Sequence, residues 1–230
     1  MTTSSQASSP HSFFTRFPCA LGHLGVLLEP ASILAKAWDQ IARIGHRARD
    51  WRPRTLLVTG AGPIGLLAAM MGAQRGLDVH VLDHHRGGVK PALVCDLGAT
   101  YHDTTVVETL EHVAPDIIIE CTGVPSVIRD ALGRTTAVGI VCLTGVSGEG
   151  HSDDMDLGWL GRTLVLNNDV VFGTVNANRS HYEAAANALA FADRKWLGRL
   201  VTRRLPLERW SEALQPAPDD VKAIIEFPPV

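Results

Sequence analysis

Apolar and polar residues follow two different periods along this chain. Short apolar runs, typical of strands buried on both faces, recur at Thr55–Thr59, Asp78–Leu82, Asp116–Cys121, Ala137–Leu143 and Asp169–Phe172. Segments with apolar residues at helical spacing lie between these runs, so strands and helices are predicted to alternate. Because the intervening segments are long enough for parallel crossovers, the pattern predicts an α/β fold with a doubly wound parallel sheet.

The predicted helices lie between the strands and on either side of them. The first opens at Glu29-Pro30, since proline suits the first helical position, and its apolar face comprises Ala31, Leu34, Ala35, Trp38, Ile41 and Ala42. The others are expected at Pro63–Arg75, Val89–Leu97, Ser126–Arg134, Asp156–Val165 and His181–Phe191, with a short one near Leu207–Leu214.

A glycine-rich turn joins the first predicted strand to the next helix. Its glycines, Gly60, Gly62 and Gly65, follow the pattern G-x-G-x-x-G. In dinucleotide-binding folds the first glycine allows a sharp turn, the second lets a pyrophosphate approach, and the third packs helix on strand. The phosphates then meet the free N–H groups at the helix start. A glycine-rich turn without a ligand is the alternative interpretation.

An acidic residue ends the second predicted strand. Asp83 follows the turn at the roughly 20-residue spacing expected for a carboxylate that binds the adenosine ribose hydroxyls. His84, His85 and Arg86 come next, and these donors suit a ribose 2′-phosphate, which Asp83 would repel. The carboxylate favours NAD and leaves NADP open. The alternative interpretation of these four residues is a solvated polar loop without a ligand.

Composition and charge exclude several classes of protein. The 230 residues are 46% hydrophobic, which suits a sizeable core, and the formal net charge of −3 provides no basic field for nucleic acid. No apolar run reaches the roughly 18 residues that a membrane span needs. Residues 1–16 are Ser-rich and lack a secretory pattern, so a disordered leader is expected.

The cysteines and the acidic loop do not form a metal-binding pattern. The four cysteines are scattered without a C-x-x-C pair, and Cys121 and Cys142 are expected to be buried thiols in a cytoplasmic protein. His151, Asp153 and Asp154 show no ligand spacing and indicate a solvated loop.

Polar residues follow the later strands too. Glu120–Gly123 and Leu143–Val146 lie at carboxyl ends of predicted strands, where doubly wound sheets bind ligands. Asn176 and Asn178 occur in an unusually polar run after the last strand of the sheet. They suit either a binding role or a turn and helix cap.

Longer runs resemble a known family. These runs are Gly25–Ser32, Gly60–Gly65, Ile118–Gly123, Leu166–Asn168, Gly173–Asn178 and Thr202–Leu207. From about residue 17 to 228 the chain resembles the C-terminal, cofactor-binding part of medium-chain zinc-dependent dehydrogenases, in the glucose 1-dehydrogenase branch. The Leu-Leu-Glu-Pro and Gly-Thr-Val-Asn runs carry this resemblance more specifically than the glycine turn.

The resemblance implies a Rossmann-like domain that binds NAD or NADP, and it assigns residues to each part of the cofactor. The turn residues Gly60, Gly62, Pro63, Ile64 and Gly65 hold the pyrophosphate, and Asp83, His84, His85 and Arg86 select the adenosine ribose. The residues beside the nicotinamide half are Thr122, Thr144, Gly145, Val146, Thr174, Val175 and Asn176. Asn176 also touches the sugar substrate, and Glu29 belongs to the catalytic, zinc-binding and substrate site. The paired arginines that often bind a 2′-phosphate in this family are replaced by Asp83-His84-His85.

The resemblance also implies a GroES-like catalytic domain that supplies cysteine and histidine ligands to zinc, and no stretch of this chain matches it. Catalytic zinc needs three protein ligands and an open position, whereas only Glu29 is a candidate here. Zinc is therefore not expected to bind stably to this chain alone, and alcohol oxidation is expected to be very slow.

Two functions are compatible with these observations. One is an NAD(P)-dependent sugar dehydrogenase that acts with a separate catalytic half, and the other is a non-catalytic dinucleotide-binding module or remnant. A methyltransferase also combines a glycine loop with an acid after the second strand, but the family-specific runs disfavour it.

The expected organisation has four parts: a leader (1–16), a segment with the first helix (17–52), a Rossmann domain (53–198), and a C-terminal segment (199–230) that packs on the catalytic domain in the family. Without that partner, one face of the Pro30–Ala48 helix would be exposed, as would Leu205, Leu207, Trp210 and Leu214. Such apolar surface favours a homo-oligomer or a separate partner.

Overall fold

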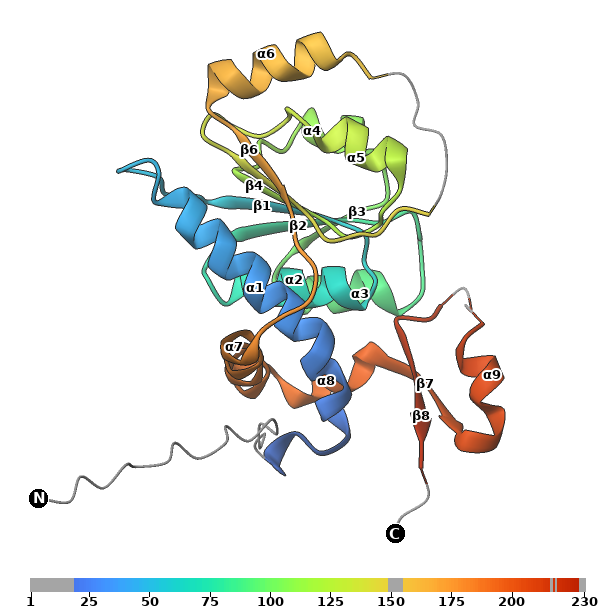
Figure 1. Ribbon diagram of the computed structural model, residues 1–230. Helices are drawn as coiled ribbons and strands as arrows, with labels where there is room; N and C mark the ends of the chain where they lie inside the picture. The colour runs from blue at the N-terminus through green and yellow to red at the C-terminus, as the bar shows by residue number, and fades with distance from the viewer. Residues whose placement is uncertain (1–18, 149–154, 216, 218, 228–230) are drawn as a thin grey trace, which may run out of the picture.

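A six-stranded parallel sheet forms the centre of the computed structural model, which describes residues 19–148, 155–215, 217 and 219–227 (Figure 1). Along the sheet the strand order is β3-β2-β1-β4-β5-β6. The strands are β1 (Thr55–Thr59), β2 (Asp78–Leu82), β3 (Thr100–His102), β4 (Ile117–Glu120), β5 (Ile140–Leu143) and β6 (Val170–Gly173). This order reverses between β1 and β4, as in dinucleotide-binding folds, and it confirms the predicted fold class.

Helices cover both faces of the sheet (Figure 1). One face carries α1 (Leu28–Gly45), α2 (Pro63–Ala73), α3 (Val89–Cys95) and α7 (Arg179–Phe191), and the other carries α4 (Val106–Leu110), α5 (Pro125–Ala131) and α6 (Leu157–Asn167). Neighbouring residues of β1 show the two-sided burial, since Leu56 and Val58 join the first core cluster and Leu57 joins the second. A strand buried on both faces is apolar at successive positions, which explains the continuous runs.

Two short helices have no counterpart in the sequence prediction. Thr105 and Glu108 form a capping box at the start of α4, with Glu108 N donating to Thr105 Oγ1 at 3.2 Å. Asp193 caps α8 (Arg194–Leu200), where Trp196 is buried and its Nε1 donates to Leu93 O at 2.8 Å. With five residues, α4 is too short for a helical period to be visible in the sequence, and α8 begins directly after the cap residues that follow α7, so it does not stand out as a separate segment.

Several predicted boundaries are wrong by two or three residues, including the end of the helix predicted over Ser126–Arg134, which ends at Ala131. Two others are wrong as well, and local hydrogen bonds explain them. The strand predicted over Ala137–Leu143 begins only at Ile140, because Val138 has a positive φ of 66° and donates its N–H to Asn167 O. The helix predicted from His181 begins at Arg179. The predicted capping role of Asn178 is confirmed, since its side chain accepts from His181 N at 3.1 Å.

The C-terminal segment forms a second, two-stranded parallel sheet of β7 (Val201–Pro206) and β8 (Lys222–Glu226). Between the strands lie η2 (Leu207–Arg209) and α9 (Trp210–Ala213), while η1 (Cys19–Leu27) precedes α1. Arg203 stabilises the connection, because its guanidinium donates to Glu212 O and Gln215 O and pairs with Asp220 at 2.6 Å.

The expected exposure of apolar residues is partly confirmed. Leu207, Trp210 and Leu214 are exposed, but Leu205 is only 5% exposed and the expectation for it is wrong. It is also wrong for the apolar face of α1, since that face, Trp38 included and Ala42 excepted, is buried in the core that contains α2 and α7. Within the described residues no helix combines the length and apolarity needed to cross a membrane. The leader and the loop with His151, Asp153 and Asp154 lie outside the described residues.

Candidate functional site

The three glycines of the turn meet different surroundings. Gly60 has a φ of 91°, and a Cβ there would lie 2.9 Å from Thr122 Cγ2. A Cβ at Gly65 would overlap the carbonyl oxygen of Gly60, whereas a Cβ at Gly62 would meet no atom within 4 Å. The chain itself therefore requires glycine at positions 60 and 65. Position 62 is open, as a site for a pyrophosphate needs it to be.

The helix after the turn begins without a side-chain cap. Gly62 is the N-cap residue of α2 and Pro63 its first residue, and no side chain accepts from the first N–H groups. These groups and the positive end of the helix dipole suit a bound anion.

A cleft of about 540 Å³ lies at the carboxyl ends of β1, β2 and β4. Its walls include Gly60, Gly62, Asp83, Thr105 and Thr122. A larger cavity, about 750 Å³, lies at the opposite end of α2, beside α7 and α8. The topology selects the smaller cleft, because doubly wound sheets bind ligands where the strand order reverses.

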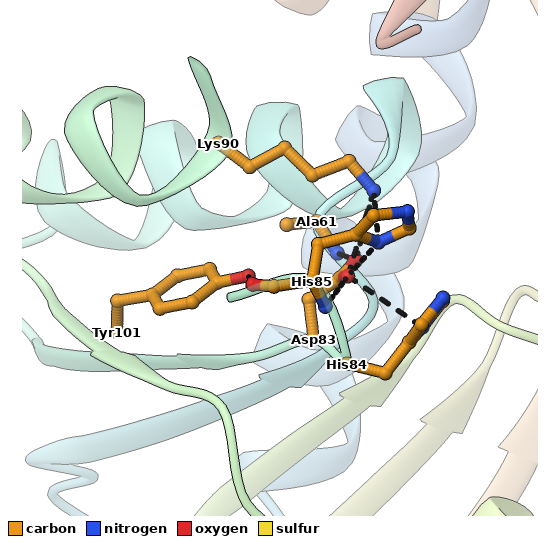
Figure 2. A network of polar contacts seen from close by, with 6 residues as sticks. All are labelled: Ala61, Asp83, His84, His85, Lys90 and Tyr101. Carbon is orange, nitrogen blue, oxygen red and sulfur yellow. Dashed lines mark hydrogen bonds and ion pairs between the residues drawn. The ribbon is translucent and has the colours of Figure 1, made fainter. Parts of the chain in front are cut away.

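Asp83 is the centre of a polar network behind the glycine turn (Figure 2). Its carboxylate is 6% exposed, and Oδ2 accepts from Ala61 N at 2.7 Å and from Lys90 Nζ at 3.2 Å. Oδ1 accepts from His85 N at 3.0 Å and lies 2.6 Å from His85 Nδ1. Tyr101 Oη donates to His85 O at 2.5 Å. The network thus ties the turn to the β2–α3 loop.

The residues predicted to select the ribose separate into two pairs. Asp83 Oδ1 lies 2.6 Å from His85 Nδ1, and the side chains of both residues are largely buried. The side chains of His84 and Arg86 are 87% and 83% exposed, with His84 Nδ1 3.6 Å from Asp83 and Arg86 Nε 3.7 Å from Asp103. Lys90 balances the charge of Asp83, so the repulsion of a 2′-phosphate is weaker than the sequence alone suggests. A ribose diol would have to replace existing contacts of the carboxylate. No sequence motif singles out Lys90, since its burial arises from the packing of α3.

Two pKa values in this network are shifted. Burial alone would raise the pKa of Asp83, but hydrogen bonds from His85 and Ala61 and the charge of Lys90 outweigh it and lower the pKa to about 2. Burial, with the charges of Asp83 and Asp103, raises the pKa of Tyr101.

The lowered pKa of Asp83 predicts a contribution to acid stability. The folded pKa, about 2, lies below the ordinary value of 3.8, so the contribution is complete above about pH 4 and is lost as the pH falls through the folded pKa. We expect Asp83→Asn to be less stable than the unchanged chain at pH 5, and this difference to shrink by about 2 kcal/mol at pH 2. Urea unfolding across this pH range measures it, and a constant difference would contradict the stabilising role of the ionised carboxylate.

The residues predicted for the nicotinamide side come from three strand ends. Thr122 follows β4, and Thr144 and Gly145 follow β5, where their N–H groups donate to Glu120 O at 2.8 and 3.1 Å. Val146 is exposed. Thr174 follows β6, donates its N–H to Leu143 O at 3.0 Å, and has a buried Oγ1 without a hydrogen-bond partner. The adjacent strand ends therefore bring these threonines to one edge of the sheet.

The loop after β6 is held against α1. Lys36 Nζ donates to Val175 O at 2.8 Å, and the next residue, Asn176, is exposed with a positive φ of 60°. Glu29, also exposed, lies seven residues before Lys36 and so on the same face of α1, about 10 Å away along the helix. Glu29 and Asn176 thus belong to neighbouring elements.

The described residues do not assemble a zinc site around Glu29. Among them, the group of three potential ligands whose ligating atoms lie within 4.8 Å of one another is Asp83, His84 and His85. The ammonium group of Lys90 lies 3.1 Å from His85 Nδ1 and 3.2 Å from Asp83, in competition with any cation. Glu29 lacks the three protein ligands that catalytic zinc needs, and at Asp83 the charge of Lys90 opposes a cation, so neither location fits catalytic zinc.

Comparison with known proteins identifies the family. Residues 22–227 match the family model described as glucose dehydrogenase C-terminus. The chain belongs to this family. The predicted resemblance to the glucose 1-dehydrogenase branch is therefore confirmed.

Members of the family supply close relatives. Glucose 1-dehydrogenase 2 of Vulcanisaeta moutnovskia is 38% identical over 219 residues, which cover 94% of this chain and 62% of that protein. Glucose 1-dehydrogenase of Methanocella arvoryzae is 38% identical over 218 residues, covering 91% and 60%. The crystal structure of glucose dehydrogenase from Haloferax mediterranei matches with a TM-score of 0.88 and 30% identity, covering 96% of this chain and 64% of that one. Another structure of the Haloferax enzyme is a complex with NADP, Zn and gluconolactone.

The chain spans about three fifths of the length of these relatives. The match includes the glycine turn, the Asp83 network and the loop after β6, all of which lie within residues 22–227. The family relationship thus covers every described element from α1 to β8.

Proposed function

We propose that the chain is the cofactor-binding part of an NAD(P)-dependent oxidoreductase related to glucose 1-dehydrogenase. The observation that carries this proposal is the open position at Gly62, beside the uncapped start of α2. When bound, a nicotinamide dinucleotide would supply the acceptor for the hydride that leaves carbon C1 of a sugar, while the C1 hydroxyl gives up its proton. The NADP and gluconolactone in the Haloferax enzyme support this chemistry.

Each part of the site would have a separate task. The turn from Gly60 to Gly65 would receive the pyrophosphate, and the Asp83 network would hold the adenosine end. Thr122, Thr144 to Val146 and Thr174 to Asn176 would border the nicotinamide half, and the buried, unpartnered Oγ1 of Thr174 is a suitable hydrogen-bonding group there. Asn176 and Glu29 would contact the sugar. Because the described residues do not fit zinc, no step of this proposal passes through a metal.

Cofactor choice depends on the β2–α3 loop. The carboxylate of Asp83 favours the ribose diol of NAD, while Lys90, His84 and Arg86 together favour a 2′-phosphate. We retain NAD as the first choice and NADP as the alternative, and a direct comparison of the two affinities decides between them.

The isolated 230-residue chain is expected to bind NAD(H) but not to oxidise glucose measurably. Binding requires only the described cleft, whereas oxidation requires polarisation of the sugar oxygen, for which no described ligand set is in place. Calorimetric titration with NAD and NADP, with and without zinc, measures binding, and absorbance of NADH measures turnover. Absence of binding to both cofactors would refute the proposal. Zinc-dependent oxidation by the chain alone would refute the separation of binding from catalysis.

A non-catalytic dinucleotide-binding module remains the second candidate, favoured by the lack of a described zinc site.

We further propose that this chain associates with a second copy of itself or with a separate catalytic half. The exposed apolar side chains of Leu207, Trp210 and Leu214 support this proposal. Cys95, Cys121 and Cys142 are free thiols; Cys142 is buried and Cys121 partly buried, and burial raises the pKa of Cys121 to about 12. Free thiols support a reducing, cytoplasmic location.

A further inference from the structure

Glu120 is a buried carboxylate at the carboxyl end of β4. It is 0% exposed, and no Lys, Arg or His pairs with it among the ion pairs of the described residues. A buried carboxylate requires hydrogen-bond donors in place of water. Thr122 supplies its N–H at 2.6 Å and its hydroxyl, and Gly123 supplies its N–H at 3.1 Å from Oε1 and 3.2 Å from Oε2. Thr59, at the end of β1, donates its hydroxyl at 3.3 Å.

The backbone of the same residue holds the next strand end. Glu120 O accepts from Thr144 N and Thr144 Oγ1, both at 2.8 Å, and from Gly145 N at 3.1 Å. A Cβ at Gly145 would lie 2.7 Å from Glu120 Oε2 and would overlap the backbone of Gly123. The turns after β4 and β5 are therefore packed directly against each other around one residue.

We infer that Glu120 is a positioning residue that sets the nicotinamide side of the site through Thr122, Thr144 and Gly145. This inference rests on the proposed cofactor site. The adenosine side has its own anchor, since the contacts of Asp83 go to Ala61, His85 and Lys90. Loss of the Glu120 contacts should therefore weaken the binding of the nicotinamide half of a dinucleotide more than that of the adenosine half.

The carboxylate is suited to this task because it only accepts hydrogen bonds. The N–H groups of Thr122 and Gly123 and two threonine hydroxyls all donate to it. A glutamine of the same size would direct an NH₂ group at one or more of these donors, and an unpaired buried donor destabilises its surroundings. The Thr122–Gly123 turn would have to move to relieve the conflict.

The test compares two ligands on Glu120→Gln. NADH contains the nicotinamide ring, whereas ADP-ribose keeps the adenosine and pyrophosphate but lacks that ring. We expect the affinity for NADH to fall by about tenfold and the affinity for ADP-ribose to change by less than about twofold. Calorimetry gives both affinities, and thermal unfolding reports the integrity of the fold. If Glu120→Gln does not fold, Glu120→Asp, which keeps the charge and shortens the side chain, is measured in the same way with the same expectation.

Asp116→Asn is the matched control, because Asp116 precedes the same strand and also accepts from backbone N–H groups, those of Arg54 and Thr55, and from the hydroxyl of Thr136. We expect it to lower stability without changing the ratio of the two affinities. An equal loss of NADH and ADP-ribose affinity in the Glu120 variant would overturn the inference, as would no loss of either. If the unchanged chain binds neither ligand, the proposed function fails, and the inference fails with it.

Discussion

Gly62→Val is expected to abolish cofactor binding by this chain while the fold survives. A Cβ at this position meets no atom within 4 Å, and the φ and ψ of −79° and −176° suit a β-branched residue. The side chain would nevertheless occupy the space in front of α2 where the pyrophosphate is proposed to bind. We expect the affinity for NAD(H) to fall by about a hundredfold or more, equivalent to ~3 kcal/mol. Calorimetry measures the affinity, and thermal unfolding checks the fold.

Gly161→Ala serves as the control, since a Cβ there is equally free of contacts but lies on α6, remote from the turn. It should leave the affinity unchanged. If the Gly62→Val variant binds NADH with the same affinity as the unchanged chain, the phosphates bind somewhere other than the glycine turn.

The alternation of strands and helices and the position of the turn could be predicted because they depend on local rules. A strand buried on both faces must be apolar at successive positions, and a strand that turns sharply into a helix needs glycine. Both rules leave a mark in the sequence, as in Leu56–Val58 and at Gly60 and Gly65. The capping role of Asn178 could be predicted for the same reason, since a cap acts within one turn of helix.

Features that depend on packing between distant segments have no recognisable pattern in the sequence. Lys90 is buried because α3 places it against Asp83 at the end of β2, and a single lysine in a short helix has no distinctive period. Lys36 likewise shows its role only when the loop at Val175 lies beside α1. The burial of Leu205 comes from the second sheet, whose parallel pairing joins segments separated by η2 and α9.

Glu120 combines a feature that could be predicted from the sequence with one that could not. Its place at a strand end could be predicted from the apolar run before it, but the convergence of donors from β1 and β4 on its side chain could not. The sequence pattern therefore locates the cleft, while the side chains that shape the cleft emerge from the folded chain.

Gly65→Ala should have the opposite profile to Gly62→Val, with a large loss of stability. The new Cβ would overlap the carbonyl oxygen of Gly60, and a backbone atom in a tight turn has little freedom to move away. We expect the free energy of unfolding to fall by about 3 kcal/mol, and the cofactor affinity to fall with it because the turn itself must shift.

Gly72→Ala, in the same helix, is the matched control. Its Cβ would meet the end of the Leu56 side chain, and the gain in helix propensity offsets part of the cost, so a loss of about 1 kcal/mol or less is expected. Urea unfolding of both variants measures the difference, and equal losses would show that contact of Gly65 with the turn does not determine the packing of α2 on β1.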